Sequence, residues 1–137
     1  STPLTMGEYY TGSTGRGYAL FDQSGERTPG YYGMEFFQRL VAMPEGLAAE
    51  SSDPATQLIA ARSERRLLAL ASSFKTDQDK VTFHLPGRKP TPENTRLYVL
   101  DFIGVPRHLQ HEIVWAEESL TFEKVTGSAL FLLEHDL

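Results

Sequence analysis

The chain has 137 residues, the size of one ordinary domain and too few for a catalytic (β/α)8 barrel, which needs roughly 250 residues. Its formal net charge of −5 leaves no basic face for phosphate backbones, so we expect no nucleic-acid partner. There is no cysteine and no apolar run near the roughly 20 residues that span a bilayer, so we expect neither disulfides, thiolate metal sites nor a membrane partner. We expect one soluble domain over residues 1–137, and the initial Ser1, in place of Met, suggests a processed or excised chain.

The N-terminal residues predict an irregular segment. Residues 1–17 are rich in Gly, Ser, Thr and Tyr, and the glycines of residues 12–17 make regular structure unfavourable. Residues 18–21 are short and apolar, and the turn-forming residues 22–25 follow them. The pattern predicts a loop, then the end of a strand and a turn.

Thr28 and Pro29 predict the start of a helix, with Thr as the N-cap and Pro at the first position, where its missing N–H loses no hydrogen bond. Apolar side chains then recur at the spacing of a helix: Tyr32, Phe36, Phe37, Leu40 and Val41. Pro44 and Gly46 end the pattern, so we expect about four turns. The aromatic stripe is expected to bury itself against a sheet or a neighbouring domain.

Residues 52–73 fit two different structures. Ala, Leu, Arg and Glu dominate the segment, so local propensity favours a helix that begins after Ser52. The alternative is a hairpin of two buried strands, residues 58–62 and 66–72, joined near residues 63–65. A continuous apolar pattern is compatible with both structures. We predict the hairpin.

The rest of the chain predicts short strands. Val81, Phe83 and Leu85 alternate with polar residues until Pro86 and Gly87 end the run. Further β-prone segments are residues 97–103, 113–115, 120–125 and 129–133, separated by polar or glycine-containing breaks. Strands at this density predict a mainly β fold, an antiparallel β-sandwich with one N-terminal α-helix.

One stretch carries a pattern found in a known family. It reads Gly-Tyr-Ala-Leu-Phe-Asp at residues 17–22, reaches Gly25, and continues as Thr-Pro-Gly-Tyr-Tyr at residues 28–32. This order resembles the end of the barrel in clan A glycoside hydrolases, where the last strand precedes a Leu-Phe-Asp-x-x-Gly turn, a Lys- or Thr-Pro step, aromatic residues and the closing helix. Many members append a β-sandwich, and residues 81–87, 97–102 and 129–134 resemble its strands.

The resemblance implies a function for the chain as a part of a larger enzyme. Residues 1–45 would be the end of a TIM barrel and residues 46–137 a sandwich, together a non-catalytic C-terminal accessory domain of a polysaccharide-degrading glycoside hydrolase. The implied partner is the catalytic barrel, packed against the helix face of Tyr32, Phe36, Phe37 and Leu40. The sequence specifies no compartment, although such a parent enzyme implies a secreted or periplasmic one.

Two other functions fit the same residues. A carbohydrate-binding module would hold glycan on exposed aromatic faces, for which Tyr9, Tyr10 and Trp115 are the candidates, although burial on a strand is the stronger expectation for Trp115. An independent β-sandwich protein would use its surface for assembly. An apolar patch on the helix favours a missing barrel, whereas coplanar exposed tyrosines and tryptophan favour sugar.

No catalytic or metal constellation stands out in the sequence. Glycoside hydrolysis needs two carboxylates roughly 5 to 10 Å apart, and Glu8 is a candidate without a nameable partner, so we interpret it as a loop carboxylate. His108, His111 and Glu112 lie close together in sequence, but their spacing differs from that of zinc motifs. They predict a solvated loop. We therefore expect no catalytic residue, no metal site and no cofactor in this chain.

Overall fold

The structure, a computed structural model, describes residues 20–101, 106–109, 112–123 and 127–137. Within them the chain forms one helix and nine strands, in the order α1 (Pro29–Val41), β1 (Glu45–Leu47), β2 (Thr56–Arg62), β3 (Arg66–Ser73), β4 (Val81–His84), β5 (Thr95–Leu100), β6 (Arg107–Leu109), β7 (Ile113–Trp115), β8 (Ser119–Phe122) and β9 (Ala129–Asp136).

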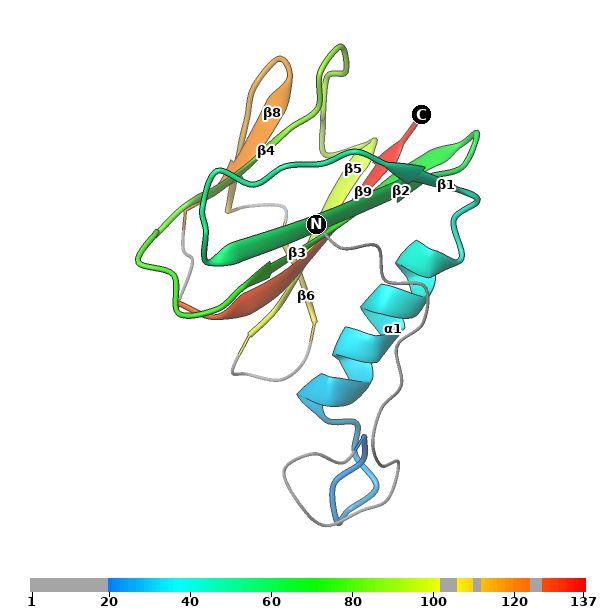
Figure 1. Cartoon of the computed structure of the whole chain (residues 1–137), viewed down its shortest axis with the longest axis vertical. Coiled ribbons are helices and arrows are strands. Elements are labelled where there is room, and N and C mark those ends of the chain that lie inside the picture. The colour runs from blue at the N-terminus through cyan, green and yellow to red at the C-terminus, as the bar shows by residue number, and fades with distance from the viewer. Residues whose placement is uncertain (1–19, 102–105, 110–111, 124–126) are drawn as a thin grey trace.

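Two antiparallel sheets and the helix form the architecture (Figure 1). The larger sheet has six strands in the order β1-β2-β3-β9-β5-β6, and the smaller has three in the order β4-β8-β7. The last strand, β9, therefore lies in the middle of the larger sheet, between β3 and β5. The predicted fold class, a mainly β antiparallel sandwich with one N-terminal helix, is confirmed.

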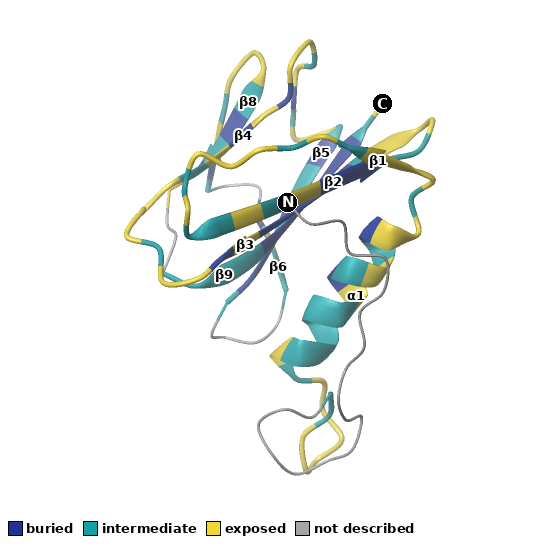
Figure 2. Ribbon diagram, viewed as in Figure 1, coloured by how far each residue is buried: buried dark blue, intermediate teal, exposed yellow. Residues whose placement is uncertain are grey.

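A hydrophobic core lies on each face of the six-stranded sheet. The helix core lies between this sheet and α1, and its buried members are Phe36, Leu40, Ala61, Leu68, Leu70, Leu100 and Leu132. The inner core lies between the two sheets, and its members include Phe83, Leu97, Leu120, Phe122, Phe131 and Leu133. Figure 2 shows buried residues along the middle strands of the larger sheet, on β4 and β8 of the smaller sheet, and on α1.

The ambiguous segment folds as the predicted hairpin of β2 and β3, and the helical alternative is wrong. The strands pair from Thr56 and Ser73 at the open end to Arg62 and Leu67 next to the turn. In β3, Leu68 and Leu70 belong to the helix core, whereas the intervening alanines belong to the inner core. Because both faces of the strand are buried, its sequence reads as a continuous apolar run, which is why its pattern also suited a helix.

The helix begins at the predicted residues. Thr28 is the N-cap residue and Pro29 lies at the first position of the helix. The Thr28 hydroxyl donates a hydrogen bond to the Leu20 carbonyl oxygen at 3.1 Å and makes none to the first turn of the helix. It therefore ties the helix start to the segment before it.

The predicted strand end before the helix is a single bridge between Phe21 and Arg27 in the described residues, and residues 18 and 19 lie outside them. Asp22 closes the turn inside this bridge, because its Oδ1 accepts hydrogen bonds from the backbone N–H groups of Ser24 and Glu26, at 2.8 and 2.9 Å. Gly25 adopts a φ of +79°, a conformation that residues with a Cβ atom rarely adopt.

Two short strands were missed by the sequence patterns. β1 pairs with β2 immediately after the helix, and β6 pairs with β5 at the edge of the sheet. The predicted loop at His108 is therefore wrong, because this residue lies in β6, whereas the predicted exposure of its side chain is confirmed. Its ring stacks on that of Tyr98, with 5.2 Å between the ring centroids. Glu-Gly-Leu and Arg-His-Leu lack the β-branched and aromatic residues that predicted the equally short strand at residues 113–115.

A buried carboxylate also ties the helix to the sheet. Glu134 on β9 is only 3% exposed, and it forms ion pairs with Arg39 of α1 and with Arg96 of β5. Arg96 donates through Nε to Glu134 Oε2 at 3.0 Å and through its two terminal nitrogens to Asp136, at 3.1 and 2.8 Å. These hydrogen bonds to Arg96 lower the pKa of the Asp136 carboxyl. One guanidinium thus joins two carboxylates of β9.

His135 is a second buried polar side chain on β9, 2% exposed. Its Nδ1 lies 2.8 Å from Thr95 Oγ1, and the Thr95 hydroxyl donates its hydrogen to Asn94 Oδ1 at 2.7 Å. Since that hydroxyl has no second hydrogen, His135 Nδ1 must be the donor, which fixes the tautomer of the neutral ring. Burial lowers the pKa of His135, and the charge of Arg88 lowers it further.

The free energy of unfolding is expected to fall as the pH decreases below about 6.5, the ordinary pKa of histidine. The unfolded chain takes up a proton at His135 near that pH, whereas the folded chain does so only at lower pH, so acid favours unfolding. Urea denaturation between pH 7.5 and 5 measures the slope. His135→Gln should flatten it, and His84→Gln, at an exposed strand position, should leave it unchanged; equal slopes in the two variants would contradict the assignment.

Candidate functional site

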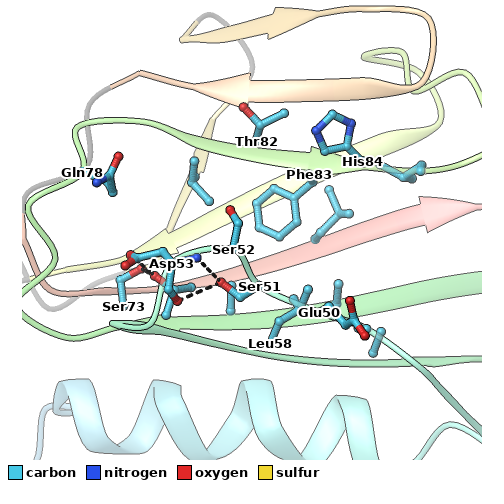
Figure 3. A pocket seen from close by; sticks show the side chains of 18 of the residues that line it. Glu50, Ser51, Ser52, Asp53, Leu58, Ser73, Gln78, Thr82, Phe83 and His84 are labelled. Carbon is cyan, nitrogen blue, oxygen red and sulfur yellow. Dashed lines mark hydrogen bonds between the residues drawn. The ribbon is translucent and has the colours of Figure 1, made fainter. Parts of the chain in front are cut away.

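A groove of about 1160 Å³ lies between the two sheets (Figure 3). The inner sides of β2 and β3 form its floor. The connection between β1 and β2, residues 48–54, forms one wall, and residues 76–78 and strand β4 form the other. The groove exists because a three-stranded sheet faces a six-stranded one and leaves part of the inner side of β2 and β3 uncovered.

Small side chains make the floor of the groove deep. Ala60, Ala69 and Ala71 line it, where the opposite face of β3 carries Leu68 and Leu70. An alanine fills much less of the space between two layers than a leucine does, so this strip of the inner core leaves more room beside the smaller sheet than a strip of leucines would. Larger apolar side chains, Leu58 and Phe83, border the floor (Figure 3).

Asp53 fixes the wall of the groove. Its Oδ2 accepts hydrogen bonds from the hydroxyls of Thr76 and Thr56, at 2.7 and 2.8 Å, and its Oδ1 accepts one from the Ala55 backbone N–H at 3.0 Å. The hydrogen bond from Thr76, followed by those from Ala55 and Thr56, lowers the pKa of the Asp53 carboxyl. The carboxylate therefore stays ionised and holds three segments together, which suits a structural role better than proton transfer.

The charges around the groove nearly balance. Glu50, Asp53 and Asp77 line it, together with Lys80 and Arg88. Among the described residues, no group of three or more His, Asp or Glu side chains is placed to hold a metal ion. In the same part of the chain, no helix has the length and apolarity needed to cross a membrane.

The residues predicted from the sequence that the structure describes do not line the groove. Tyr9, Tyr10, Glu8 and His111 fall outside the described residues. Trp115 is half-buried on β7, packed against the inner core, and does not line the groove. Sequence reasoning missed the groove. Its one local trace is the alternation of leucine and alanine in residues 68–71, which places the leucines on one face of β3 and the smaller alanines on the other.

The helix face predicted to meet a barrel is partly used within the chain. Phe36 and Leu40 are 4% and 5% exposed and pack on the six-stranded sheet, and Tyr32 and Phe37 are half-buried against the same core. Phe36 and Leu40 are therefore not available to another domain. Val41, in contrast, is 47% exposed. Contact between the helix and a barrel stays a prediction.

No known protein family and no curated protein matches the sequence, but solved structures match the fold. Xyn30A, a glycoside hydrolase family 30 subfamily 8 xylanase from Clostridium acetobutylicum, matches with a TM-score of 0.63 and 15% identity over 86% of this chain and 31% of its own. CelM2, a bifunctional glucanase-xylanase from a metagenome library, matches with a TM-score of 0.59 and 15% identity over 80% of this chain and 22% of its own.

The chain has the fold of one part of these enzymes. It spans less than a third of the length of either. The likeness to glycoside hydrolases indicated by residues 17–32 thus extends to the fold of most of the chain.

Proposed function

We propose that this chain is a non-catalytic accessory domain of a polysaccharide-degrading glycoside hydrolase and packs against the catalytic barrel of that enzyme. The observation that carries the proposal is the fold match, in which 86% of this chain corresponds to 31% of a xylanase chain. The resemblance of residues 17–32 to the end of a barrel supports it independently. From the names of Xyn30A and CelM2, the polysaccharide is a xylan or a glucan.

The helix has the two apolar sides that such a position requires. Phe36 and Leu40 fix one side to the sandwich. By the 3.6-residue period, Tyr31, Met34 and Val41 lie on the other side, which we call the outer helix surface. A helix that is apolar on opposite sides is typical of a position between two layers. The outer helix surface is therefore the part of α1 that we assign to the barrel.

Aromatic contacts extend this surface beyond the start of the helix. The ring of Tyr31 lies 5.5 Å from that of Phe21 and 5.7 Å from that of Tyr32, between centroids. The Arg27 guanidinium lies 4.6 Å from the centroid of the Tyr31 ring. The turn before the helix is thereby held against α1, so turn and helix can contact a neighbouring domain as one rigid body.

In the complete enzyme, Val41→Asp is expected to lower the melting temperature by several degrees, because it places a charge in the proposed contact with the barrel. In the 137-residue chain alone the same change should have little effect, since Val41 is 47% exposed there. Thermal unfolding of both proteins measures the difference. Val114→Asp is the matched control, because Val114 is 54% exposed and lies on β7, in the other sheet.

Equal effects of the two substitutions in the complete enzyme would contradict the proposed contact. The gene offers a second test. We expect the reading frame to continue several hundred residues upstream of Ser1 and to encode barrel strands that end in Asn-Glu and Glu motifs. An initiator Met codon immediately upstream of Ser1 would contradict the accessory-domain function itself.

A further inference from the structure

We propose that the groove between the two sheets binds a stretch of neutral oligosaccharide, so that the domain contacts polysaccharide directly as well as the barrel. The choice of glycan rests on the proposed function, and the binding site itself rests on the groove. The volume of about 1160 Å³ exceeds the roughly 300 to 1000 Å³ of most small-ligand sites, as a site for several linked sugar rings requires.

The floor suits the apolar faces of sugar rings. Leu58, Ala60 and Ala69 present aliphatic carbon on the inner side of β2 and β3. The C–H groups of a pyranose ring pack against such a surface, and the small alanines leave the depth that a ring needs. In the empty groove, these side chains lack van der Waals partners on the side that faces the groove, and a bound ligand would supply them.

The rim supplies hydrogen-bonding groups along both walls. Ser51 and Ser52 are exposed on one side and Gln78 on the other, whereas Thr82 and His84 point away from the floor on the opposite face of β4 from Phe83 (Figure 3). Hydroxyl and amide groups both donate and accept hydrogen bonds, as sugar hydroxyls do. Because the ionic groups around the groove nearly balance, a neutral glycan fits better than an anionic one.

An extended polypeptide is the alternative occupant, because it could pair with the free edge of β4. This strand pairs with β8 along one edge and has no strand on its other edge among the described residues. Yet β4 has only four residues, Lys80 precedes it and Pro86 follows it closely. Short strands flanked by lysine and proline are features that protect an edge against pairing with another chain. These features favour glycan over peptide.

Titration of the purified 137-residue chain with xylohexaose and, separately, with cellohexaose tests the proposal. Backbone amide NMR should show shifts in residues 51–53 and 78–84, with a dissociation constant on the order of 0.1 to 1 mM for at least one of the two. Gln78→Ala should weaken binding about fivefold, because it removes a rim hydrogen bond. Gln57→Ala is the matched control, an exposed glutamine on the opposite face of β2, and should leave the affinity within about twofold.

A second pair of variants blocks the groove without touching its floor. Ser52→Trp should abolish binding, whereas Ser72→Trp, an exposed serine on the opposite face of β3, should not. Absence of shifts with both oligosaccharides at about 10 mM overturns the proposal, as do shifts that map to Trp115 in place of the groove. Shifts in β4 with a strand-forming peptide but with neither glycan overturn it in favour of strand addition.

This result is independent of contact with the barrel. Val41 lies on α1, across the six-stranded sheet from the groove, so Val41→Asp should leave glycan binding unchanged. If Val41→Asp and Val114→Asp behave alike in the complete enzyme while glycan still binds, the barrel contact fails and the groove stands. If instead Val41→Asp and Val114→Asp differ in the complete enzyme but neither oligosaccharide binds, the groove proposal fails and the barrel contact stands.

Discussion

Phe131→Ala is expected to lower the free energy of unfolding by about 3 to 5 kcal/mol and the melting temperature by about 10 °C or more. Phe131 is fully buried, and its ring centroid lies 6.4 Å from that of Phe83 and 6.0 Å from that of Phe122. It belongs to β9, the strand in the middle of the larger sheet, and both neighbours come from the smaller sheet. Truncation therefore leaves a cavity where the two layers of the sandwich meet.

Urea denaturation followed by tryptophan fluorescence measures this loss, because the one tryptophan, Trp115, packs against the same inner core. Phe74→Ala is the matched control. Phe74 is 68% exposed, so its truncation should change the free energy of unfolding by less than about 0.5 kcal/mol. A similar loss in both variants would show that the cavity between the sheets is not the cause.

Arg96→Met is expected to lower the free energy of unfolding by about 2 to 4 kcal/mol, because it leaves the buried Glu134 carboxylate with Arg39 as its one remaining ion-pair partner among the described residues. The aliphatic part of methionine keeps most of the packing of the arginine stem. Adding Glu134→Gln should then recover part of the loss, since a neutral amide is less costly to bury than an underpaired carboxylate.

The double-mutant cycle of Arg96→Met and Glu134→Gln, read by urea denaturation, separates this ionic contribution from packing. Arg62→Met provides the control for an exposed pair, because Arg62 and Glu45 are 42% and 56% exposed, and it should have little effect. Strict additivity of the two substitutions would exclude the proposed coupling between Arg96 and Glu134.

The elements that the sequence predicted are those with a local signal. Thr28 and Pro29 define the start of the helix, because Thr is one of the few residues favoured at the N-cap and Pro is favoured at the first position, where its missing N–H loses no hydrogen bond. The hairpin of β2 and β3 was harder to predict, because a strand buried on both faces lacks the alternation of apolar and polar residues that identifies most strands. β1 and β6 were missed because their residues, Glu-Gly-Leu and Arg-His-Leu, have low strand propensity, unlike the Ile-Val-Trp of β7.

The groove could not be predicted, since it depends on which strands become neighbours. Residues 50–60 and 78–84 come from separate parts of the sequence and meet only after the sheets assemble. Nothing in the sequence indicates that one sheet has twice as many strands as the other, which is what leaves part of the inner side of β2 and β3 uncovered. The alternation of leucine and alanine in residues 68–71 indicates a small face on β3 but not what lies opposite that face, and the search for aromatic residues led to Trp115, which packs against the inner core.

The position of β9 between β3 and β5 has a consequence for synthesis of the protein. In the larger sheet, β1, β2 and β3 form one group of paired strands and β5 and β6 another, and in the described part of the chain these two groups are hydrogen-bonded to each other only through β9. The centre of the fold is supplied by residues 129–136, which are translated last among its strands. A premature stop codon before them would therefore release two unconnected half-sheets, each exposing a long unpaired edge to aggregation.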